Sequence, residues 1–571
     1  MSDVFGPQNP DCDRVHAQKY RQKGETFKEA MTRVASALAD SEPHFQSFRS
    51  ILLHQRFLPA GRIQSCVGAP RATTPYNCFV SGPIEDSYTR GHGSIMARAA
   101  EAAETMRLGG GIGYDFSPIR PLGDIIRTLE SLASGPVSFM HIYDAVGRVT
   151  ASTDQRRGAQ MGVLRVDHPD IELFVRAKQN NTALTGFNIS VAVTNEFMEA
   201  VLLDSDFPLR FGGRVYKAVR AQYLWDLIMR TNYDWSEPGV LFIDTINKMN
   251  NLRYCETIAA TNPCGEQPLP PYGACLLGSI NLTKLLKPIL PLGTWEFNYR
   301  QLIADIPYII RAMDNVVDLA RYPLFEQEKE AKSKRRMGIG ITGTANAIEA
   351  LGHPYGSEAF VTTLKSILRT IANTAYMASV KLAQEKGAFP AFQKSPYLSS
   401  RFVRHLPDTV QEEMAIYGIR NSHLLSIAPT GTISLCADNI SSGIEPVFAL
   451  TTQRTIQTFE GPRVVTIEDF GAKYLRIKGK TAEECTANDH LEVLKACAPF
   501  IDSAVSKTCN VPNNISWESF KDIYVEAWKA GCKGCTTHRT GNGRGAILVS
   551  QDEPAPAACE INPSTGVRNC E

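Results

Sequence analysis

The sequence predicts an α/β fold with largely parallel strands. Three apolar runs have the length and composition of buried strands: Ile189–Val193, Val240–Ile243 and Leu424–Ile427. They alternate with longer segments whose apolar residues recur at helical spacing, namely Gln222–Arg230 and Phe360–Lys386. This alternation is typical of a parallel sheet whose strands are connected by helices.

The composition divides the chain into three parts. Residues 1–56 form a short N-terminal helical segment, because residues 24–55 place apolar side chains at helical spacing. Residues 57–549 contain no low-complexity stretch and no clear repeat, which predicts one large unit. Residues 550–571 begin with a proline-containing stretch without an apolar face, which predicts a flexible tether for Cys559 and Cys570. An inert tail is the equally weighted alternative.

Composition excludes several classes of protein. The chain has 571 residues with 60 basic and 59 acidic side chains, so it lacks the basic excess of nucleic-acid-binding proteins. The N-terminus has no apolar signal region, and no window of about 18 apolar residues predicts a membrane span. Fourteen cysteines without an export signal predict a reducing, cytoplasmic compartment and thiol chemistry.

The segment Thr261–Gln267 carries the clearest chemical signal. Its sequence, Thr-Asn-Pro-Cys-Gly-Glu-Gln, places Cys264 two residues from Asn262 and two residues from Glu266. In an extended loop these three side chains project to one side. A carboxylate can then act as general base or acid while sulfur performs nucleophilic or radical chemistry. A loop with incidental cysteines is the alternative from these residues alone.

Several ordered motifs resemble the ribonucleotide reductases. The segment around Cys264 is similar to the finger loop of that family, and Cys275 follows eleven residues later within Gly273–Leu282. The resemblance covers roughly residues 57–547, and its further motifs are Phe57–Arg62, Asn77–Val80, Gly109–Gly113, Ser134–Phe139, Arg335–Gly340 and Ala428–Ser434.

The resemblance implies a fold and a set of catalytic roles. The fold would be a ten-stranded α/β barrel of two antiparallel halves, each with five parallel strands, around a central finger loop. Cys264 would carry a transient thiyl radical, Glu266 would deprotonate the ribose 3′-hydroxyl, and Asn262 would hydrogen-bond the ribose. Cys78 and Cys275 would be the reductant pair, oxidised to a disulfide as the 2′-hydroxyl leaves as water. They are far apart in sequence, so the fold must bring their Cα atoms within about 7 Å.

The resemblance also implies binding residues. For the substrate these are Ala60, Asn77, Gly111, Thr430, Gly431 and Thr432, the last three at the phosphates; an ordinary strand-to-helix turn is the alternative for that segment. For a deoxynucleoside triphosphate effector they are Asp86 and Ser87 at a helix start, with Arg120 and Arg127. Residues 154–161 match the loop that links effector to substrate choice. Only 56 residues precede Phe57, so we expect specificity control without an overall activity switch.

The radical source follows by exclusion among the family's classes. Thr536 and Thr537 stand where class I enzymes have two tyrosines, and Arg539–Gly545 lacks a glycyl-radical motif. Class II, which uses adenosylcobalamin, remains; a class I catalytic subunit with a separate radical-generating subunit is the alternative. We expect diphosphate substrates, a homodimer, and thioredoxin or glutaredoxin acting through Cys559 and Cys570.

Two weaker signals and one further alternative function leave other interpretations open. Cys532 and Cys535 form a lone C-x-x-C that could be redox-active, half of a zinc site or without a role, and we assign it none. A zinc site needs two more ligands, so we predict no protein-ligated metal. Gly338–Gly343 fits the dinucleotide pattern G-x-G-x-x-G, but it follows a charged run and family resemblance attributes its glycines to helix packing. A non-catalytic nucleotide-binding regulator is the third alternative.

Overall fold

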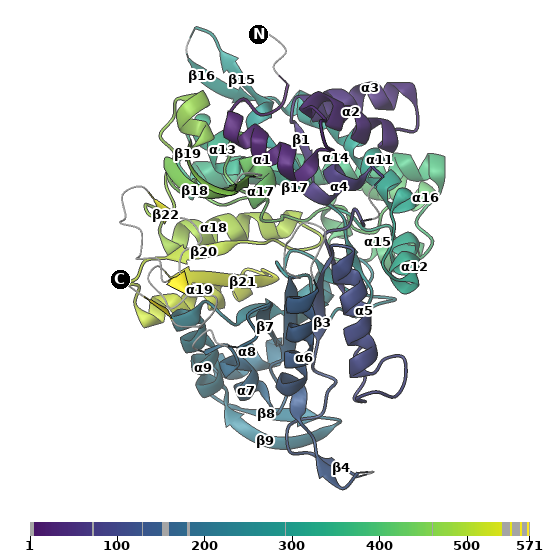
Figure 1. The fold of residues 1–571 in the computed structure, drawn as a ribbon, viewed down its shortest axis with the longest axis vertical. Coiled ribbons are helices and arrows are strands. Elements are labelled where there is room, and N and C mark those ends of the chain that lie inside the picture. Colours follow the sequence, from purple (N-terminus) through teal and green to yellow (C-terminus); the bar gives the residue numbers. More distant parts are fainter. Residues whose placement is uncertain are drawn as a thin grey trace.

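The computed structural model describes most of the chain. It covers residues 5–539 apart from 71–72, 128, 151–158, 180–182, 292 and 459–460, and also the pairs 549–550, 560–561 and 568–569. The N-terminal helices lie at one end of the molecule, and β4 (Ile125–Ile126), β8 (Asp206–Phe211) and β9 (Arg214–Arg220) lie toward the other end (Figure 1). Among the described residues, no helix combines the length and apolar character needed to span a membrane.

The larger sheet contains five parallel strands, whose order in the sheet is the same as their order in the chain. They are β2 (Cys78–Val80), β3 (Gly111–Asp115), β6 (Gln160–Arg165), β7 (Phe187–Val193) and β10 (Gly239–Phe242). Helices connect them: α5 (Ile95–Arg107), α6 (Gly135–Val149), α7 (Ile171–Arg176), α8 (Asn195–Leu202) and α9 (Ala221–Trp235). The prediction of an α/β fold is therefore confirmed. The run at residues 189–193 lies inside β7, and residues 240–242 of the second run lie inside β10, whereas Ile243 begins the next helix.

Antiparallel neighbours flank these strands at both edges. At one edge β13 (Ala274–Cys275) pairs with β2, and at the other β21 (Gly534–Arg539) pairs with β10. Strand β20 (Thr508–Val511) continues the sheet parallel to β21. The chain direction thus reverses at each edge of the parallel set.

A second, smaller sheet contains β1 (Phe57–Pro59), β14 (Leu277–Asn281) and β17 (Gly338–Thr342). Strands β14 and β17 are parallel, whereas β1 is antiparallel to β14. Isolated parallel bridges join Ile339 to Leu425 and Ile427 to Val505. Among the described residues the ladders do not form one continuous closed barrel.

The apolar run Leu424–Ile427 was predicted to be a strand, but it forms only isolated bridges and no regular strand. The Asp502 carboxylate accepts hydrogen bonds from Leu424 N at 2.7 Å and Leu425 N at 3.0 Å, which occupies two amides that a ladder would use.

The helix-packing explanation for the glycines of β17 is also wrong. A Cβ on Gly340 would lie 2.4 Å from Ser426 O, so glycine permits close approach of two extended segments.

Three helices form the N-terminal segment: α1 (Pro10–Tyr20), α2 (Phe27–Leu38) and α3 (Glu42–Leu53). The last two lie within the segment predicted to be helical, and a capping box between Thr26 and Glu29 starts α2. Helix α1 was not predicted because its surface is largely polar; the Asn9 cap and Pro10 define its start. Helices α2 and α3 share a core with α11 (Tyr299–Leu319) and α14 (Glu358–Lys386).

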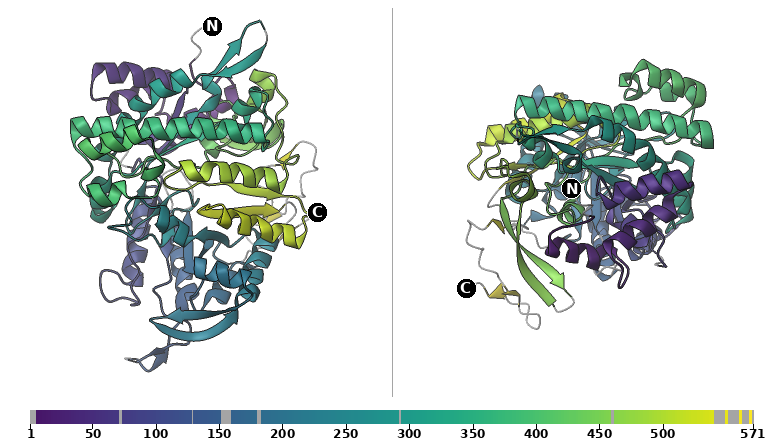
Figure 2. Two further views of the ribbon diagram at one scale, coloured as in Figure 1. Left: turned by 180° about the vertical axis from the view of Figure 1, so that it is seen from behind. Right: turned by 90° about the horizontal axis from the view of Figure 1, so that it is seen from above.

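Helix α14 crosses the molecule near α18 (Ala487–Cys497), as Figure 2 shows.

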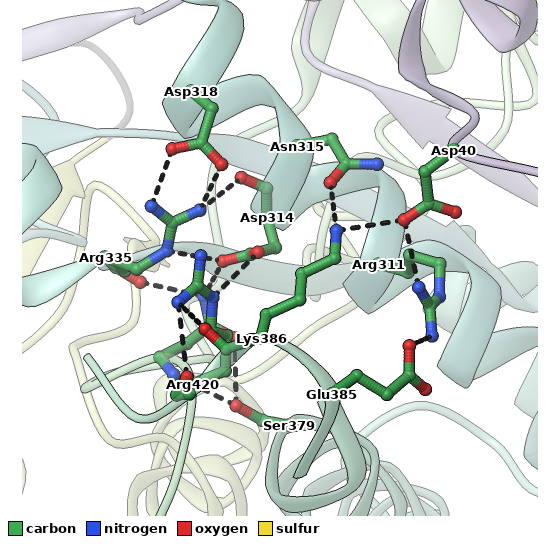
Figure 3. Close-up of polar contacts among 12 residues, drawn as sticks. Asp40, Arg311, Asp314, Asn315, Asp318, Arg335, Ser379, Glu385, Lys386 and Arg420 are labelled. Carbon is green, nitrogen blue, oxygen red and sulfur yellow. Dashed lines mark hydrogen bonds and ion pairs between the residues drawn. The ribbon is translucent and has the colours of Figure 1, made fainter. Parts of the chain in front are cut away.

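A buried ionic cluster lies where α11 meets the segment before β17 (Figure 3). Asp314 is fully buried and accepts from Arg335 Nε at 2.8 Å, Arg420 Nε at 3.1 Å and Asn421 Nδ2 at 2.8 Å. Arg335 also pairs with Asp318 at 2.8 Å. The cluster joins three segments that are distant in sequence.

Replacing Asp314 with alanine is expected to destabilise the fold by about 3–5 kcal/mol, because the buried Arg335 and the partly buried Arg420 lose their shared carboxylate. The measurement is chemical denaturation followed by circular dichroism. The control is Lys478→Ala, which removes an exposed pair with Glu484 at 3.4 Å and should cost at most about 1 kcal/mol. Equal losses in the two variants would contradict this account of the cluster.

Candidate active site

The segment that carries Cys264 is a β-hairpin. Strand β11 (Ala260–Thr261) pairs antiparallel with β12 (Pro268–Leu269), and Asn262 N donates to Gln267 O at 3.1 Å across the tip. Gly265 N donates to Asn262 O at 3.1 Å, with Gly265 at φ +80°. The extended loop expected from the sequence is therefore wrong, because the left-handed glycine closes a tight turn. The turn, not strand alternation, sets the directions of these side chains.

The hairpin lies directly against the parallel sheet. A Cβ on Gly113, in β3, would lie 1.9 Å from Thr261 O, so only glycine allows this approach. A Cβ on Gly111 would lie 3.2 Å from both Cys78 Sγ and Pro263 Cγ. Gly111 therefore acts as a spacer between the hairpin and the cysteine of β2, and it is not in the wall of the cavity described below.

Cys264 lies at the junction of two cavities, of about 270 Å³ and about 280 Å³. Its side chain is accessible, but this accessible surface faces the two cavities and protein surrounds it. Burial, with smaller contributions from Glu266 and Cys78, raises the pKa of its thiol well above the ordinary value. At neutral pH the group is a protonated thiol, which suits hydrogen-atom transfer better than thiolate nucleophilic attack.

Glu266 combines burial with an open hydrogen-bonding position. Its side chain is buried and lines the first cavity, and Oε2 has no hydrogen-bond partner among the described residues. Burial raises the pKa of Glu266 to about 7. A carboxyl group with that pKa can both accept and return a proton near neutral pH.

Two amides are buried close to this carboxyl group. Asn262 Oδ1 accepts from Gln267 N at 3.0 Å. Its side chain lies near enough to the Glu266 carboxyl to oppose the rise in the pKa of that group, but Nδ2 completes no hydrogen bond within the described part of the chain. Asn77 lines the first cavity, and its Oδ1 is likewise unsatisfied among those residues. Buried polar groups normally have partners, so these atoms indicate a polar ligand.

Cys78 and Cys275 lie opposite one another on neighbouring strands. They are directly paired in the antiparallel ladder of β2 and β13, and Asn77 N donates to Cys275 O at 3.2 Å. Their thiols are within hydrogen-bonding reach, and both cysteines are free. Burial, followed by the Cys78 thiol, raises the pKa of Cys275 well above its ordinary value. The fold thus brings together two thiols separated by almost 200 residues, as the family resemblance implied.

The first cavity collects most of the predicted substrate residues. Ala60, Asn77 and Cys78 form one part of the wall, and the turn Thr430–Thr432 forms another, with Cys264 and Glu266 between them. Thr430 has φ +55°, and its Oγ1 lies 3.0 Å from Thr342 Oγ1. The lining residues that sequence reasoning missed include Lys19, Tyr20, Arg62 and Ser65. Arg62 was at the end of a recognised motif, whereas no motif marks α1.

The second cavity adjoins a third of about 570 Å³. The two share five residues: Ser236, Pro429, Ser506, Thr508 and Thr536. Thr537 points into the core, where its Oγ1 donates to Asn232 Oδ1 at 2.6 Å and contacts Tyr524 Oη at 2.9 Å. Neither threonine offers a phenol for long-range radical transfer.

The predicted effector residues are only partly assembled. Asp86 accepts from Arg120 Nε at 2.6 Å and Arg120 N at 3.2 Å, so these two are brought together. Ser87 Oγ donates to Arg90 O at 2.8 Å, and Arg127 is exposed. The expected helix start at Asp86 is wrong, because α5 begins at Ile95 with Ser94 as its cap. Cys559, Cys570 and residues 154–158 lie outside the described residues.

Comparison with known proteins decides the family. A family model described as the barrel domain of ribonucleotide reductase matches residues 76–538, which is most of the chain. The chain belongs to the ribonucleotide reductase family. The matched range contains the Cys264 hairpin, both cysteines of the Cys78–Cys275 pair and the Thr430–Thr432 turn, so the geometry described above lies within the family's own domain.

Named relatives of this ribonucleotide reductase match between about two thirds and nearly all of its length. A vitamin B12-dependent ribonucleoside-diphosphate reductase of Mycobacterium tuberculosis is 36% identical over 96% of this chain and 81% of its own. A protein of the same name from Thermoplasma acidophilum is 30% identical over 92% of this chain and 69% of its own. The ribonucleoside-diphosphate reductase large chain of Cryptosporidium parvum is 26% identical over 66% of this chain.

Proposed function

We propose that this ribonucleotide reductase converts ribonucleoside diphosphates to 2′-deoxyribonucleotides with a radical on Cys264 whose formation depends on adenosylcobalamin. The carrying observation is the position of Cys264 between a nucleotide-sized cavity that contains Cys78 and a second cavity on its other side. The names of the two relatives that are at least 30% identical support cobalamin dependence and diphosphate substrates.

In the proposed mechanism the ribose lies in the first cavity. The Cys264 thiyl radical removes the 3′-hydrogen, while Glu266 accepts the proton of the 3′-hydroxyl and Asn262 Nδ2 hydrogen-bonds the ribose. The 2′-hydroxyl leaves as water. Cys78 and Cys275 supply two electrons and two protons and form a disulfide, so one ribonucleotide and two thiols give one deoxyribonucleotide, one disulfide and one water. Cys264 then returns its hydrogen to C3′.

The second and third cavities fit a large amide-bearing macrocycle. Val447 and Phe448 give the third cavity an apolar wall, while Ser506, Thr508 and Thr536 supply hydroxyl groups where it meets the second. These residues would hold adenosylcobalamin, whose homolysable cobalt–carbon bond supplies the oxidising equivalent for radical formation. The chain's own part is to hold Cys264 as a protonated thiol at the boundary and to separate it from bulk water.

The remaining parts of the proposal concern binding and organisation. The Thr430–Thr432 turn would hold the substrate phosphates, with Ala60 and Asn77 at the ribose. Asp86, Ser87, Arg120 and Arg127 would bind the deoxynucleotide effector, for which the Asp86–Arg120 contact is partial support. Cys559 and Cys570 would pass electrons from thioredoxin or glutaredoxin to the Cys78–Cys275 disulfide, in a homodimer.

We also propose that the two sheets are arcs of one ten-stranded barrel. The five parallel strands would form one half. The other half would contain β14, β17, residues 424–427, β20 and β21. The bridges Ile339–Leu425 and Ile427–Val505 support this closure. Residues 1–56, 57–549 and 550–571 would be the helical segment, the catalytic unit and the redox tail.

The test is reduction of CDP by the purified chain alone, with a dithiol, a deoxynucleotide effector and adenosylcobalamin. Formation of dCDP that stops when only cobalamin is omitted is the expected result. A requirement for a second protein instead of cobalamin would contradict the proposal and favour the class I alternative.

Glu266 is expected to set the pH dependence of the reaction. It must be deprotonated to accept the 3′-hydroxyl proton, so kcat/KM should rise with pH through about 7, the value to which burial raises its pKa. Glu266→Gln should lower kcat by about 10²–10⁴-fold and remove this rising limb. The matched control is Glu349→Gln, since burial raises the pKa of that carboxyl to about 7 as well but it lines none of these cavities. An unchanged pH profile in Glu266→Gln would contradict its role as base.

A further inference from the structure

Helix α1 forms part of the wall of the nucleotide cavity. Lys19 and Tyr20, at its C-terminal end, line this cavity together with Thr432 and Ile433 of α17 (Gly431–Leu435). Tyr20 also packs in one apolar cluster with Leu58 and Ile433. The N-terminal segment is therefore part of the site and not only a lead-in to it.

Specific contacts fix the start of α1 beside α17. Gln8 N and Asn9 N each donate to Asp438 Oδ1 at 2.8 Å, and Asp438 follows the last residue of α17 by three positions. Cys12 and Cys436 are buried in the same cluster. The helix start is thus attached to the segment that immediately follows the proposed phosphate turn.

The end of α1 is fixed on a second wall element, α4 (Gly61–Cys66). His16 Nε2 lies 2.9 Å from Gln64 Oε1 of that helix. A Cβ on Gly61 would lie 2.3 Å from Cε1 of Tyr20, so the tyrosine ring rests directly on the glycine. Because α1 is attached to α17 at its start and to α4 at its end, the position of Lys19 relative to the cavity is determined.

Two basic residues line the cavity. Lys19 and Arg62 are the basic residues among its lining residues, and Glu266, at the hairpin, is the acidic one. In the part of the chain that the structure describes, no carboxylate forms an ion pair with Lys19. Burial and the neighbouring Cys12 thiol raise the pKa of Cys436, which follows the last residue of α17. The Lys19 ammonium acts in the opposite direction and lowers this pKa, so the charge of Lys19 reaches the end of α17.

We propose that Lys19 binds the phosphate groups of the substrate nucleotide and is a substrate-binding residue contributed by the N-terminal helix. A cation without a carboxylate partner, held beside the Thr430–Thr432 turn, is suited to the negative charge of a nucleotide diphosphate. The ammonium stabilises the bound anion and takes no part in the chemistry at the ribose. This inference rests on the proposed function, because it assumes that the first cavity holds the substrate.

The test compares Lys19→Met with Lys19→Arg and with Lys23→Met, which removes the same charge from an exposed residue outside the cavity. In steady-state reduction of CDP, Lys19→Met should raise KM about 10-fold with little change in kcat, and Lys19→Arg should restore most of the affinity. Lys23→Met should leave KM unchanged. Calorimetric binding to the Cys264→Ser background should show the same loss for CDP and none for cytidine, which lacks phosphate.

Equal CDP affinity in Lys19→Met and the unaltered chain would overturn the inference. Equal losses for CDP and cytidine would also overturn it, because they would indicate a change in cavity shape. The binding measurement keeps the two proposals distinguishable. If the chain binds CDP in a Lys19-dependent manner but forms no dCDP with adenosylcobalamin, the proposed function fails while the assignment of Lys19 stands.

Discussion

Replacing Cys264 with serine is expected to abolish dCDP formation, a loss of more than about 10⁴-fold, while CDP binding is retained. Serine is close in size to cysteine, so the hairpin and both cavities should be preserved. Its O–H bond is much stronger than a thiol S–H bond, so the hydroxyl group provides no accessible radical. The structure supports this role because, among the described residues, Cys264 is the one cysteine that lines both the first and the second cavity.

The measurement is dCDP formation by chromatography, with CDP affinity determined in parallel. Cys255→Ser is the matched control, since Cys255 is exposed and lines none of the cavities described above, and it should keep full activity. Activity of Cys264→Ser within about 100-fold of the unaltered chain would contradict the radical assignment.

The second large effect is expected for the thiol pair. Cys275→Ser should lower multiple-turnover reduction by at least about 10³-fold, because the remaining Cys78 has no partner with which to form a disulfide. Cys78→Ser should have the same effect, since the two residues face each other in one ladder. Neither change should disturb the protonated thiol at Cys264.

Cys497→Ser provides the control for burial, because Cys497 and Cys275 are both fully buried but Cys497 lies on α18. Alkylation of thiols followed by mass spectrometry would show whether substrate oxidises the Cys78–Cys275 pair. A disulfide elsewhere in the chain, with this pair still reduced after turnover, would contradict the assignment of the reductant.

The regular elements could be predicted from periodicity, whereas the irregular ones could not. In strands β7 and β10 and in helices α9 and α14, buried apolar residues recur at the spacing of a strand or a helix. This local spacing is enough to predict the type of each element. The run at residues 424–427 has the same composition, but a distant carboxylate, Asp502, occupies its amides. Helix α1 depends on its cap and on tertiary contacts, neither of which gives an apolar period.

The site shows the same division. The convergence of Cys264 and Glu266 on one cavity was predicted, but a glycine turn produces it instead of an extended loop. The pairing of Cys78 with Cys275 came from family resemblance, because residues so far apart in sequence carry no local signal of contact. Lys19 was missed for a related reason, since only the attachment of α1 to two other helices brings it to the cavity.

Single-turnover reduction tests the central claim most directly, namely that one chain holds the nucleotide, the radical cysteine and the reducing thiols. The purified chain, fully reduced and freed of external dithiol, would be mixed with CDP, effector and adenosylcobalamin, and both dCDP and free thiols would be counted. The account predicts cobalamin-dependent dCDP with two thiols lost for each dCDP formed, including the Cys78–Cys275 pair, and no product from Cys264→Ser. Formation of dCDP without cobalamin, or without loss of these thiols, would contradict it.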